Sequence, residues 1–386
     1  MKKNKAIIGT AVLFFGLMIL MPQNVLSQQF NLNGQASGWM SVHPSTPFEA
    51  QLGLRYLPSL SGMKPLSQSL TLDMEFSVNG YGFYHVFHKD PSEWDGTVKP
   101  YRMWLRFASN QFEARIGLQK INFGSASLLR PLMWFDRIDP RDPLQLTDGV
   151  YGLLLRYYFL NNTNIWLWGL YGNDETKGWE FIPSDGKIPE FGGRIQIPFF
   201  SGELALSYHH RKADLKKGLL GQLPLGDEYV PENRIGLDGK WDVGIGLWVE
   251  GAITHKEIAL LPYSYTRLMN IGADYTLATG NGLYVSAEHF ILETSETAFG
   301  AGDGYSFTTL SLNYPLGLVD TISGMIFYDW ENRDLYRFVN FQRMMDQWSL
   351  YIIGFWNPDK FQIYQNLTET NLFAGKGFQI MLVFNH

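Results

Sequence analysis

The stretch Gln111-Phe112-Glu113-Ala114-Arg115-Ile116-Gly117-Leu118-Gln119 alternates apolar and polar side chains almost residue by residue. Successive side chains of a β-strand point to opposite faces, so its apolar residues share one face and its charged residues share the other. Such a strand suits a wall that has lipid on one side and water on the other. The same alternation recurs along the chain and predicts an all-β fold, a transmembrane antiparallel β-barrel.

The alternation predicts about 18 strands. They span 30–42, 48–57, 68–79, 98–108, 111–119, 149–160, 163–171, 189–197, 202–211, 232–241, 244–255, 264–277, 281–293, 304–314, 319–330, 345–356, 360–367 and 375–384. Sixteen strands are the alternative, because 163–171 and 360–367 alternate only weakly.

Short links with turn residues alternate with long polar links, which is the asymmetry of periplasmic turns and extracellular loops. The short links are Ser109-Asn110, Asn161-Asn162, Phe200-Ser201, Asp242-Val243, Gly280, Pro315-Leu316 and Asn357-Pro358. The long links are 80–97, 120–148, 172–188, 212–231, 294–303 and 331–344. The link 58–67 fits less well, because it is long where a periplasmic turn is expected.

The first residues have the composition of a secretory signal peptide. Lysines precede an apolar run from Ala6 to Met21, and Val25-Leu26-Ser27 suits signal peptidase. The run is about 16 residues, whereas a helix that spans a bilayer needs roughly 20. We therefore expect a signal peptide at 1–27 and an outer-membrane β-barrel at 28–386.

The composition excludes several other classes of protein. The chain has no cysteine, so it has neither a disulfide framework nor a lipid-anchored Cys. Aromatic residues make up 15%, which suits the interfacial girdles of a barrel. No run after residue 28 has enough consecutive apolar residues for a membrane helix. The formal net charge of −6 argues against a general nucleic-acid partner.

A secreted β-sandwich or β-helix is the competing fold, because it shows the same alternation with the charged face outward. The aromatic content and the alternation of short and long links favour the barrel. The last predicted strand favours it too, since it carries an unbroken apolar face: Phe378, Ile380, Leu382 and Phe384.

The long link 120–148 is too apolar for a loop in water. It contains Leu128, Leu129, Leu132, Met133, Trp134 and Phe135. An apolar segment of this kind packs against something. We expect it to fold inward and narrow the pore; a cap on the rim or a contact with a partner is the alternative.

Charged residues next to this link predict a constriction. The basic side chains Arg102, Arg106, Arg115 and Arg156 lie on three consecutive predicted strands, about 4.8 Å apart, and are expected to face the lumen. The remaining members of the predicted site are Asp73, Glu75 and Glu113 on the wall and Asp136, Arg137, Asp139, Arg141 and Asp142 on the link. Opposite charges across a narrow water path create a transverse field that orients solutes. Alternatively, the same groups pair as struts that fix the link.

The other charges expected to face inward are nearly balanced, which predicts weak ion selectivity. They are Arg55, Arg194, Arg234 and Lys240 against Glu203, Asp238, Glu250, Asp274 and Glu288. The sequence has no G-x-S-x-G elbow and no metal-ligand spacing. We therefore expect no enzymatic activity, catalytic residue, metal or cofactor.

The stretch Arg115-Ile-Gly-Leu-Gln119, followed by Phe123-Gly124, resembles a motif of porin-superfamily barrels, including alginate-export-type channels. The resemblance implies a passive diffusion or export pore whose loop turns into a constriction lined by Arg and Asp. The chain departs from such barrels at its last residues, because Asn385 and His386 follow Phe384 where an aromatic residue is usual.

These features predict a channel in the outer membrane of a Gram-negative cell, for passive diffusion or export of small polar or charged solutes. The alternative is a surface-exposed barrel whose long extracellular loops bind a partner or ligand. The expected partners are outer-membrane lipid, lipopolysaccharide and small polar solutes, without nucleic acid. A homo-oligomer is compatible with the sequence.

Overall fold

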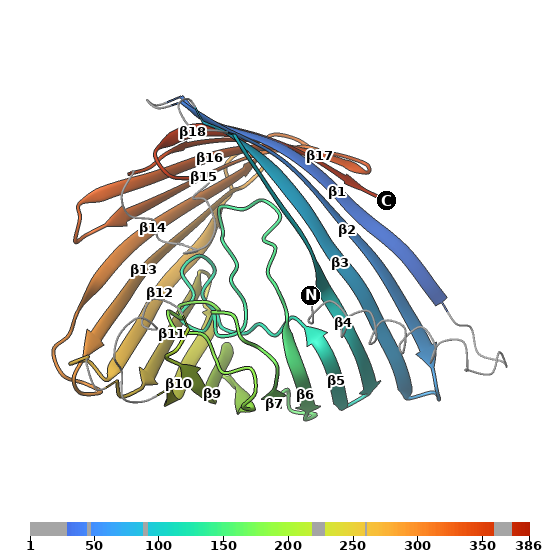
Figure 1. The fold of residues 1–386 in the computed structure, drawn as a ribbon, viewed down its shortest axis with the longest axis vertical. Helices are drawn as coiled ribbons and strands as arrows, with labels where there is room; N and C mark the ends of the chain where they lie inside the picture. Colours follow the sequence, from blue (N-terminus) through green and yellow to red (C-terminus); the bar gives the residue numbers. More distant parts are fainter. Residues whose placement is uncertain (1–28, 45–47, 88–91, 218–227, 259–260, 359–372) are drawn as a thin grey trace.

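The computed structural model describes residues 29–44, 48–87, 92–217, 228–258, 261–358 and 373–386. They form one antiparallel sheet of 18 strands that closes into a barrel, because β1 pairs with both β2 and β18 (Figure 1). Every other strand pairs with its neighbours in the chain. The predicted count of 18 is thus confirmed over the alternative of sixteen. No helix in the described ranges is long and apolar enough to cross a membrane.

The strands are β1 (Gln29–His43), β2 (Glu49–Pro65), β3 (Leu70–Phe87), β4 (Glu93–Ser109), β5 (Phe112–Gln119), β6 (Val150–Tyr158), β7 (Asn164–Leu170), β8 (Glu190–Phe199), β9 (Gly202–Asp214), β10 (Tyr229–Asp242), β11 (Gly246–His255), β12 (Tyr265–Leu277), β13 (Leu283–Ser295), β14 (Asp303–Pro315), β15 (Asp320–Asp329), β16 (Asp334–Met345), β17 (Trp348–Trp356) and β18 (Lys376–Asn385). We call the barrel end with the short turns, such as 110–111 and 346–347, the turn rim, and the opposite end the loop rim.

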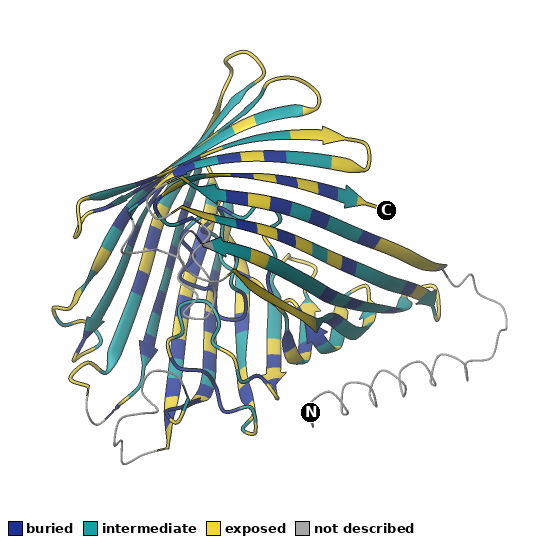
Figure 2. Cartoon of the chain, turned by 45° about the horizontal axis from the view of Figure 1, so that its top comes forward, coloured by how far each residue is buried: buried dark blue, intermediate teal, exposed yellow. Residues whose placement is uncertain are grey.

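The two faces of the wall differ as the alternation predicts. Figure 2 shows buried and exposed positions alternating along the strands. On β5, Ile116 is 58% exposed on the outer surface, whereas the adjacent Arg115 contacts Glu113 on the inner surface. Many apolar side chains on the outer face are exposed in the same way, including Leu52, Leu54, Leu167, Ile195, Leu206, Ile235, Leu237, Met269, Ile271, Ile352, Ile380 and Leu382. This outer belt suits contact with lipid.

Two predicted links are parts of strands. β2 continues to Pro65, which leaves only 66–69 as a turn and removes the long link at 58–67. The predicted long link 80–97 is mostly the continuation of β3 and the start of β4, which pair from Gly80↔Val98 to His85↔Glu93. Tyrosine, phenylalanine and glycine follow one another here without a clear polar face, so the period-two signal fades while the backbone pairing continues.

The prediction was wrong at 331–344, where the structure has β16 instead of a long loop. The sequence pattern does not mark this strand, because its inner face carries Tyr336 and Phe338 while Arg337 and Arg343 lie on the outer face. The link Asn357-Pro358 therefore lies at the loop rim and not among the short turns. The predicted strand 360–367 lies outside the described residues.

The height of the wall is uneven around the barrel. β3 has 18 residues and β5 has 8, which correspond to about 59 Å and about 26 Å of strand at roughly 3.3 Å per residue. The two loops that leave this short sector, 120–149 and 171–189, therefore start part-way up the barrel. Figure 1 shows both of them inside the ring of strands.

The inner face of β13–β17 carries many large apolar side chains beside the buried carboxylates Glu288 and Asp329, so charged groups are not its main lining. Its large side chains are at most 3% exposed: Phe290, Phe307, Phe327, Tyr336, Phe338, Ile353 and Phe355. They belong to the same buried cluster as Phe123, Leu129 and Leu132 of loop 120–149. The aromatic wall and the loop thus form a core inside the barrel.

Candidate constriction site

Loop 120–149 enters the lumen through a local distortion of β5. Gly117 has φ of +119°, and a Cβ there would lie 2.1 Å from the carbonyl oxygen of Met103 on β4, so only glycine fits. Two residues later, the side-chain amide of Gln119 donates to the carbonyl oxygens of Arg115 (3.1 Å) and Gly152 (3.0 Å). These are the residues of the motif Arg115-Ile-Gly-Leu-Gln119, and they end the strand where the loop begins.

The loop is held on the far wall by the carboxylate of Glu250 on β11. Its Oε2 accepts the backbone N–H groups of Ser125 (2.7 Å) and Ala126 (2.8 Å), and its Oε1 accepts that of Leu132 (2.6 Å). Glu250 is fully buried. A buried carboxylate requires such donors, and they compensate for its lost hydration.

Glu288 on β13 holds the next residues in the same way. Its Oε1 accepts the N–H groups of Ser127 (2.8 Å) and Leu128 (3.0 Å), and its Oε2 accepts that of Leu129 (2.8 Å). Asn270 on β12 completes the contact, since its amide donates to the carbonyl oxygen of Leu129 (2.7 Å) and to Glu288 (3.0 Å). The loop therefore crosses the whole lumen, which confirms the predicted inward folding.

Apolar contacts fix the middle of the loop. Phe123 stacks on Trp168 of β7 with ring centroids 5.6 Å apart, and Phe135 meets the same indole edge-on at 5.4 Å. Trp134 lies over the imidazole of His209 on β9 at 6.1 Å. These buried contacts explain why a loop of this length carries so many apolar residues.

The predicted wall residues gather in a second group, the wall cluster, on the inner face of β3–β6. Arg106 donates to Asp73 through Nε (2.9 Å) and Nη2 (2.6 Å). Glu113 lies 3.8 Å from Arg106, 3.0 Å from Arg115 and 3.5 Å from Arg156. Three guanidinium groups thus share two carboxylates.

Two indole rings flank the wall cluster. Arg115 lies over Trp104 at 4.7 Å from the ring centroid, and Arg156 lies over Trp166 at 3.9 Å. The remaining predicted wall carboxylate, Glu75, accepts the indole N–H of Trp104 at 3.1 Å. The rings hold the arginine side chains against the wall.

Arg102 lies apart from the wall cluster. Its guanidinium donates to the carbonyl oxygens of Tyr101 (2.6 Å) and Thr147 (3.0 Å), so it fixes the returning end of the loop. Next to it, Lys99 forms an ion pair of 2.6 Å with Asp148.

The predicted loop charges interact mainly within the loop regions. Asp136 accepts from Arg130 at 2.9 Å, and Asp139 accepts from Arg141 through Nε (2.9 Å) and Nη2 (2.7 Å). Arg137 donates to the carbonyl oxygen of Thr176 on the other inward loop at 3.0 Å.

The carboxylate of Asp142 has a local partner as well, because it accepts the N–H of Leu144 at 3.0 Å. Burial raises the pKa of Asp142 above its ordinary value, and the N–H of Leu144 opposes that rise.

The two groups of charges do not meet. Among the described residues, no ion pair joins Arg106, Arg115 or Arg156 to a carboxylate of the loop. The wall arginines pair with wall carboxylates because the middle of the loop runs to β11 and β13, and only its returning end meets β4, at Arg102 and Lys99. The structure thus separates the predicted set into a wall cluster and a loop scaffold.

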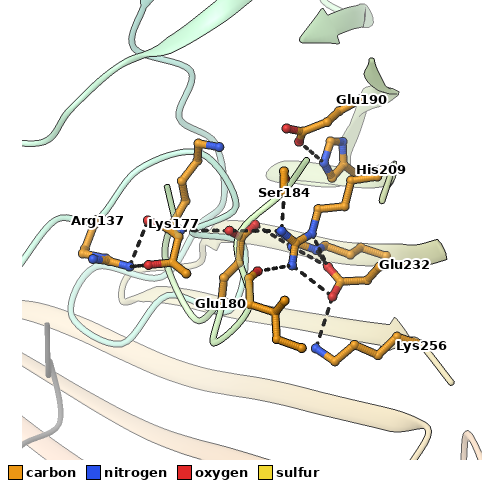
Figure 3. A network of polar contacts seen from close by, with 12 residues as sticks. Arg137, Lys177, Glu180, Ser184, Glu190, His209, Glu232 and Lys256 are labelled. Carbon is orange, nitrogen blue, oxygen red and sulfur yellow. Dashed lines mark hydrogen bonds and ion pairs between the residues drawn. The ribbon is translucent and has the colours of Figure 1, made fainter. Parts of the chain in front are cut away.

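A buried ionic network on β8–β10 was missing from the sequence-based site. Arg211 on β9 donates to Glu232 on β10 at 2.6 Å, and Lys256 donates to the same carboxylate at 3.1 Å (Figure 3). Glu180 of loop 171–189 accepts from Arg234 at 2.6 Å and lies 3.3 Å from Arg211. The predicted strands ended at Arg211 and began at Glu232, so these residues stood at uncertain boundaries. Their opposite charges at facing positions were the available signal.

The neighbouring His209 is a neutral imidazole. Trp168 has only a donor on its indole, and it donates to Nδ1 of His209 at 3.1 Å. The proton of His209 therefore lies on Nε2, which donates to Glu190 at 3.1 Å (Figure 3).

A closed barrel with an apolar outer belt and a loop folded across its lumen is a membrane-spanning barrel of the porin type. No protein-family model matches the sequence, and no curated protein matches it. Solved structures do match it in fold.

OccK7 (OpdD) of Pseudomonas aeruginosa is 10% identical with a TM-score of 0.55, and the match covers 94% of this chain and 99% of that one. OmpT, an outer membrane protein of Vibrio cholerae solved in a trimer form, is 11% identical with a TM-score of 0.52, covering 94% and 100%. An anion-selective porin from Comamonas acidovorans is 14% identical with a TM-score of 0.50, covering 93% and 100%.

At these identities the likeness establishes the fold, that of the outer-membrane porins. The fold and the apolar belt together make this chain an outer-membrane β-barrel.

Proposed function

We propose that the protein is a channel for passive diffusion or export of small polar or charged solutes across the outer membrane. One observation carries the proposal: an apolar loop is held inside a closed barrel by two wall carboxylates, Glu250 and Glu288. A loop that crosses a lumen in this way narrows it. The turn rim then faces the periplasm, as in other barrels with short turns at one end.

The water path in this proposal follows the inner face of β3–β6. The sector at β13–β17 is filled by the aromatic wall and the loop, whereas the side chain of Arg106 is 33% exposed within the wall cluster. Arg115 and Arg156 are each 16% exposed there. Solutes therefore pass the wall cluster, and the Arg/Asp constriction lies along the wall.

The wall cluster concentrates charges of both signs along this path. The guanidinium groups of Arg106, Arg115 and Arg156 lie beside three carboxylates, Asp73, Glu113 and the adjacent Glu75, so the formal charge of this part of the wall is balanced. The nearly balanced charge of the whole lumen still leaves the overall ion selectivity weak.

Substitution of arginines in the wall cluster tests whether this cluster lines the route that ions take through the barrel. We expect Arg106→Ala with Arg115→Ala to shift the reversal potential in a salt gradient toward cation preference, because two fixed positive charges leave the lumen. Arg343→Ala is the matched control, since Arg343 lies on the outer face and pairs with Asp320. An unchanged reversal potential in the double variant would remove the wall cluster from the conducting path.

Liposome swelling with purified protein tests the function itself. We expect small neutral sugars and small organic ions to enter, with rates that fall steeply with solute size. Protein-loaded liposomes that swell no faster than empty ones would reject a diffusion channel. That result would favour the alternative function, a surface-exposed barrel whose long loops bind a partner or ligand.

Further parts of the proposal concern processing, chemistry and assembly. Residues 1–27 act as a signal peptide, so mass spectrometry of the mature protein should give an N-terminus at Gln28. The proposed channel function includes no enzymatic role. The trimer form of the Vibrio cholerae protein makes a homo-oligomer a natural proposal, which light scattering in detergent tests.

A further inference from the structure

Loop 171–189 is a second segment that reaches across the barrel. The indole ring of Trp179 stacks on Phe290 of β13, with centroids 4.9 Å apart and planes 22° from parallel. Its N–H donates to the carbonyl oxygen of Arg130 in loop 120–149 at 2.8 Å. One side chain therefore contacts both the opposite wall and the first loop.

The backbones of the two loops also touch. The N–H of Gly178 donates to the carbonyl oxygen of Asp136 at 3.0 Å. Gly178 has φ of +47°, and a Cβ there would lie 1.6 Å from the carbonyl oxygen of Met133. This close approach of two backbones requires glycine.

Glu180, which follows Trp179, points away from loop 120–149 and binds the barrel wall. Its carboxylate contacts Arg234 (2.6 Å) and Arg211 (3.3 Å). It also accepts the N–H of Lys177 at 2.9 Å (Figure 3). The side chains of Arg211, Arg234 and Glu180 are each at most 5% exposed. A charge that is buried and paired in this way keeps its place, because separation would leave the partners desolvated and uncompensated.

We propose that loop 171–189 is a clamp that keeps loop 120–149 in the lumen, with Glu180 as its positioning residue and Trp179 as the contact that holds loop 120–149 near β13. The inference rests on the proposed channel function. The two neighbouring side chains point to opposite sides of the clamp. Glu180 binds β9 and β10, and Trp179 contacts Arg130 of loop 120–149 and Phe290 of β13. The width of the passage thus depends on a carboxylate outside the wall cluster.

Glu180→Gln tests the clamp in the full-length protein. The substitution keeps the shape of the side chain and removes its charge, and we expect single-channel conductance to rise by about twofold or more as loop 120–149 loosens. Glu175→Gln is the matched control, because Glu175 lies in the same loop and is exposed. Trp179→Ala should raise the conductance as well, without altering any charge.

A chemical readout separates the clamp from the channel. The chain has no cysteine, so Ala126→Cys reports the exposure of loop 120–149 alone. We expect a water-soluble thiol reagent to label this cysteine several times faster when Glu180→Gln or Trp179→Ala is added, and not when Glu175→Gln is added. Labelling needs no ion current, so it tests the clamp even if the protein does not conduct.

Unchanged labelling and conductance in both clamp variants would overturn the clamp and leave the channel standing. Absence of conductance in the unmodified protein would instead reject the channel. Glu180→Gln has failed to form a barrel if boiling does not change its migration on gels. In that case Trp179→Phe is the variant that tests the clamp. It keeps every charge and loses the hydrogen bond to Arg130, and it must still speed the labelling for the clamp to hold.

Discussion

At the scale of single residues, the alternation of side chains predicted the two faces of the wall. Ile116 faces outward and Arg115 faces inward because neighbouring side chains of a strand cannot share a face. The apolar character of 120–148 likewise predicted that the loop folds inward. Both predictions depend on residue types, which a sequence states directly.

The partners of the charged residues could not be predicted in the same way. Glu250 and Glu288 were placed in the lumen, but their partners are backbone N–H groups of residues 125–132. Every residue except proline has such a group. Residue types therefore do not show which N–H groups the two carboxylates accept. For the wall arginines, the sequence offered carboxylates on both the wall and the link as partners. It could not decide between them, because residue types alone do not predict the path of the loop.

Substitution of the two wall carboxylates should release the loop. Glu250→Gln and Glu288→Gln replace charged acceptors by neutral ones, and each should weaken the hold on the loop by about 1–3 kcal/mol. We expect a larger and noisier single-channel conductance in the double variant than in either single one. Glu203→Gln serves as the control, since that carboxylate contacts Gln196 and not the loop. A double variant that conducts like the parent protein would show that these carboxylates do not hold the constriction.

At the scale of strands and loops, β16 shows where the sequence argument fails. A polar inner face was expected of every strand, but β16 turns Tyr336 and Phe338 inward because they join the core shared with loop 120–149. On β16 the expected pattern is therefore inverted, because its aromatic side chains face the loop while Arg337 and Arg343 face outward. A strand of this kind is recognised from its aromatic inner face only when the loop's position is known.

The aromatic wall should contribute strongly to stability. Phe327 on β15 is fully buried, so Phe327→Ala should lower the free energy of unfolding by about 3–5 kcal/mol. Ile326→Ala, next to it on the outer face and 40% exposed, should cost much less in detergent. Guanidinium unfolding followed by tryptophan fluorescence measures both. A larger loss for Ile326→Ala than for Phe327→Ala would mean that β15 faces the opposite way.

The clamp should tolerate mild acid. Burial acts to raise the pKa of Glu180, but Arg211, Arg234 and Lys177 outweigh burial and the nearby Glu232, and they hold that pKa below its ordinary value. Lys256 adds a further positive charge beside Glu232. The stabilisation is therefore complete above the ordinary glutamate pKa of about 4.3 and is lost only as the pH falls through the lowered value.

We accordingly expect the difference in conductance between the parent protein and Glu180→Gln to stay constant from about pH 7 to about pH 5 and to shrink only below about pH 4. A difference that has already vanished at pH 5 would contradict the lowered pKa of Glu180.

At the scale of the whole molecule, the uneven wall explains how the site is built. The long strands β2–β4 form one side, and the short strands β5–β7 release two loops at half height, where they can cross the lumen. Closure followed from the sequence because it needs only the repeat of period two. The predicted count of 18 agrees with the structure, although the predicted strands lacked β16 and included 360–367, which lies outside the described residues. The uneven height did not follow from the sequence, since backbone pairing extends β3 and β4 beyond their alternating segments.

Single-channel recording in planar bilayers tests the central claim most directly. The account predicts discrete conductance steps from the purified protein, smaller than those of the Glu250→Gln, Glu288→Gln double variant. Heat-modifiable migration on gels confirms beforehand that the barrel is folded. A folded barrel that gives no steps at any voltage, with or without the loop variants, would contradict a water-filled path beside Arg106 and Arg115.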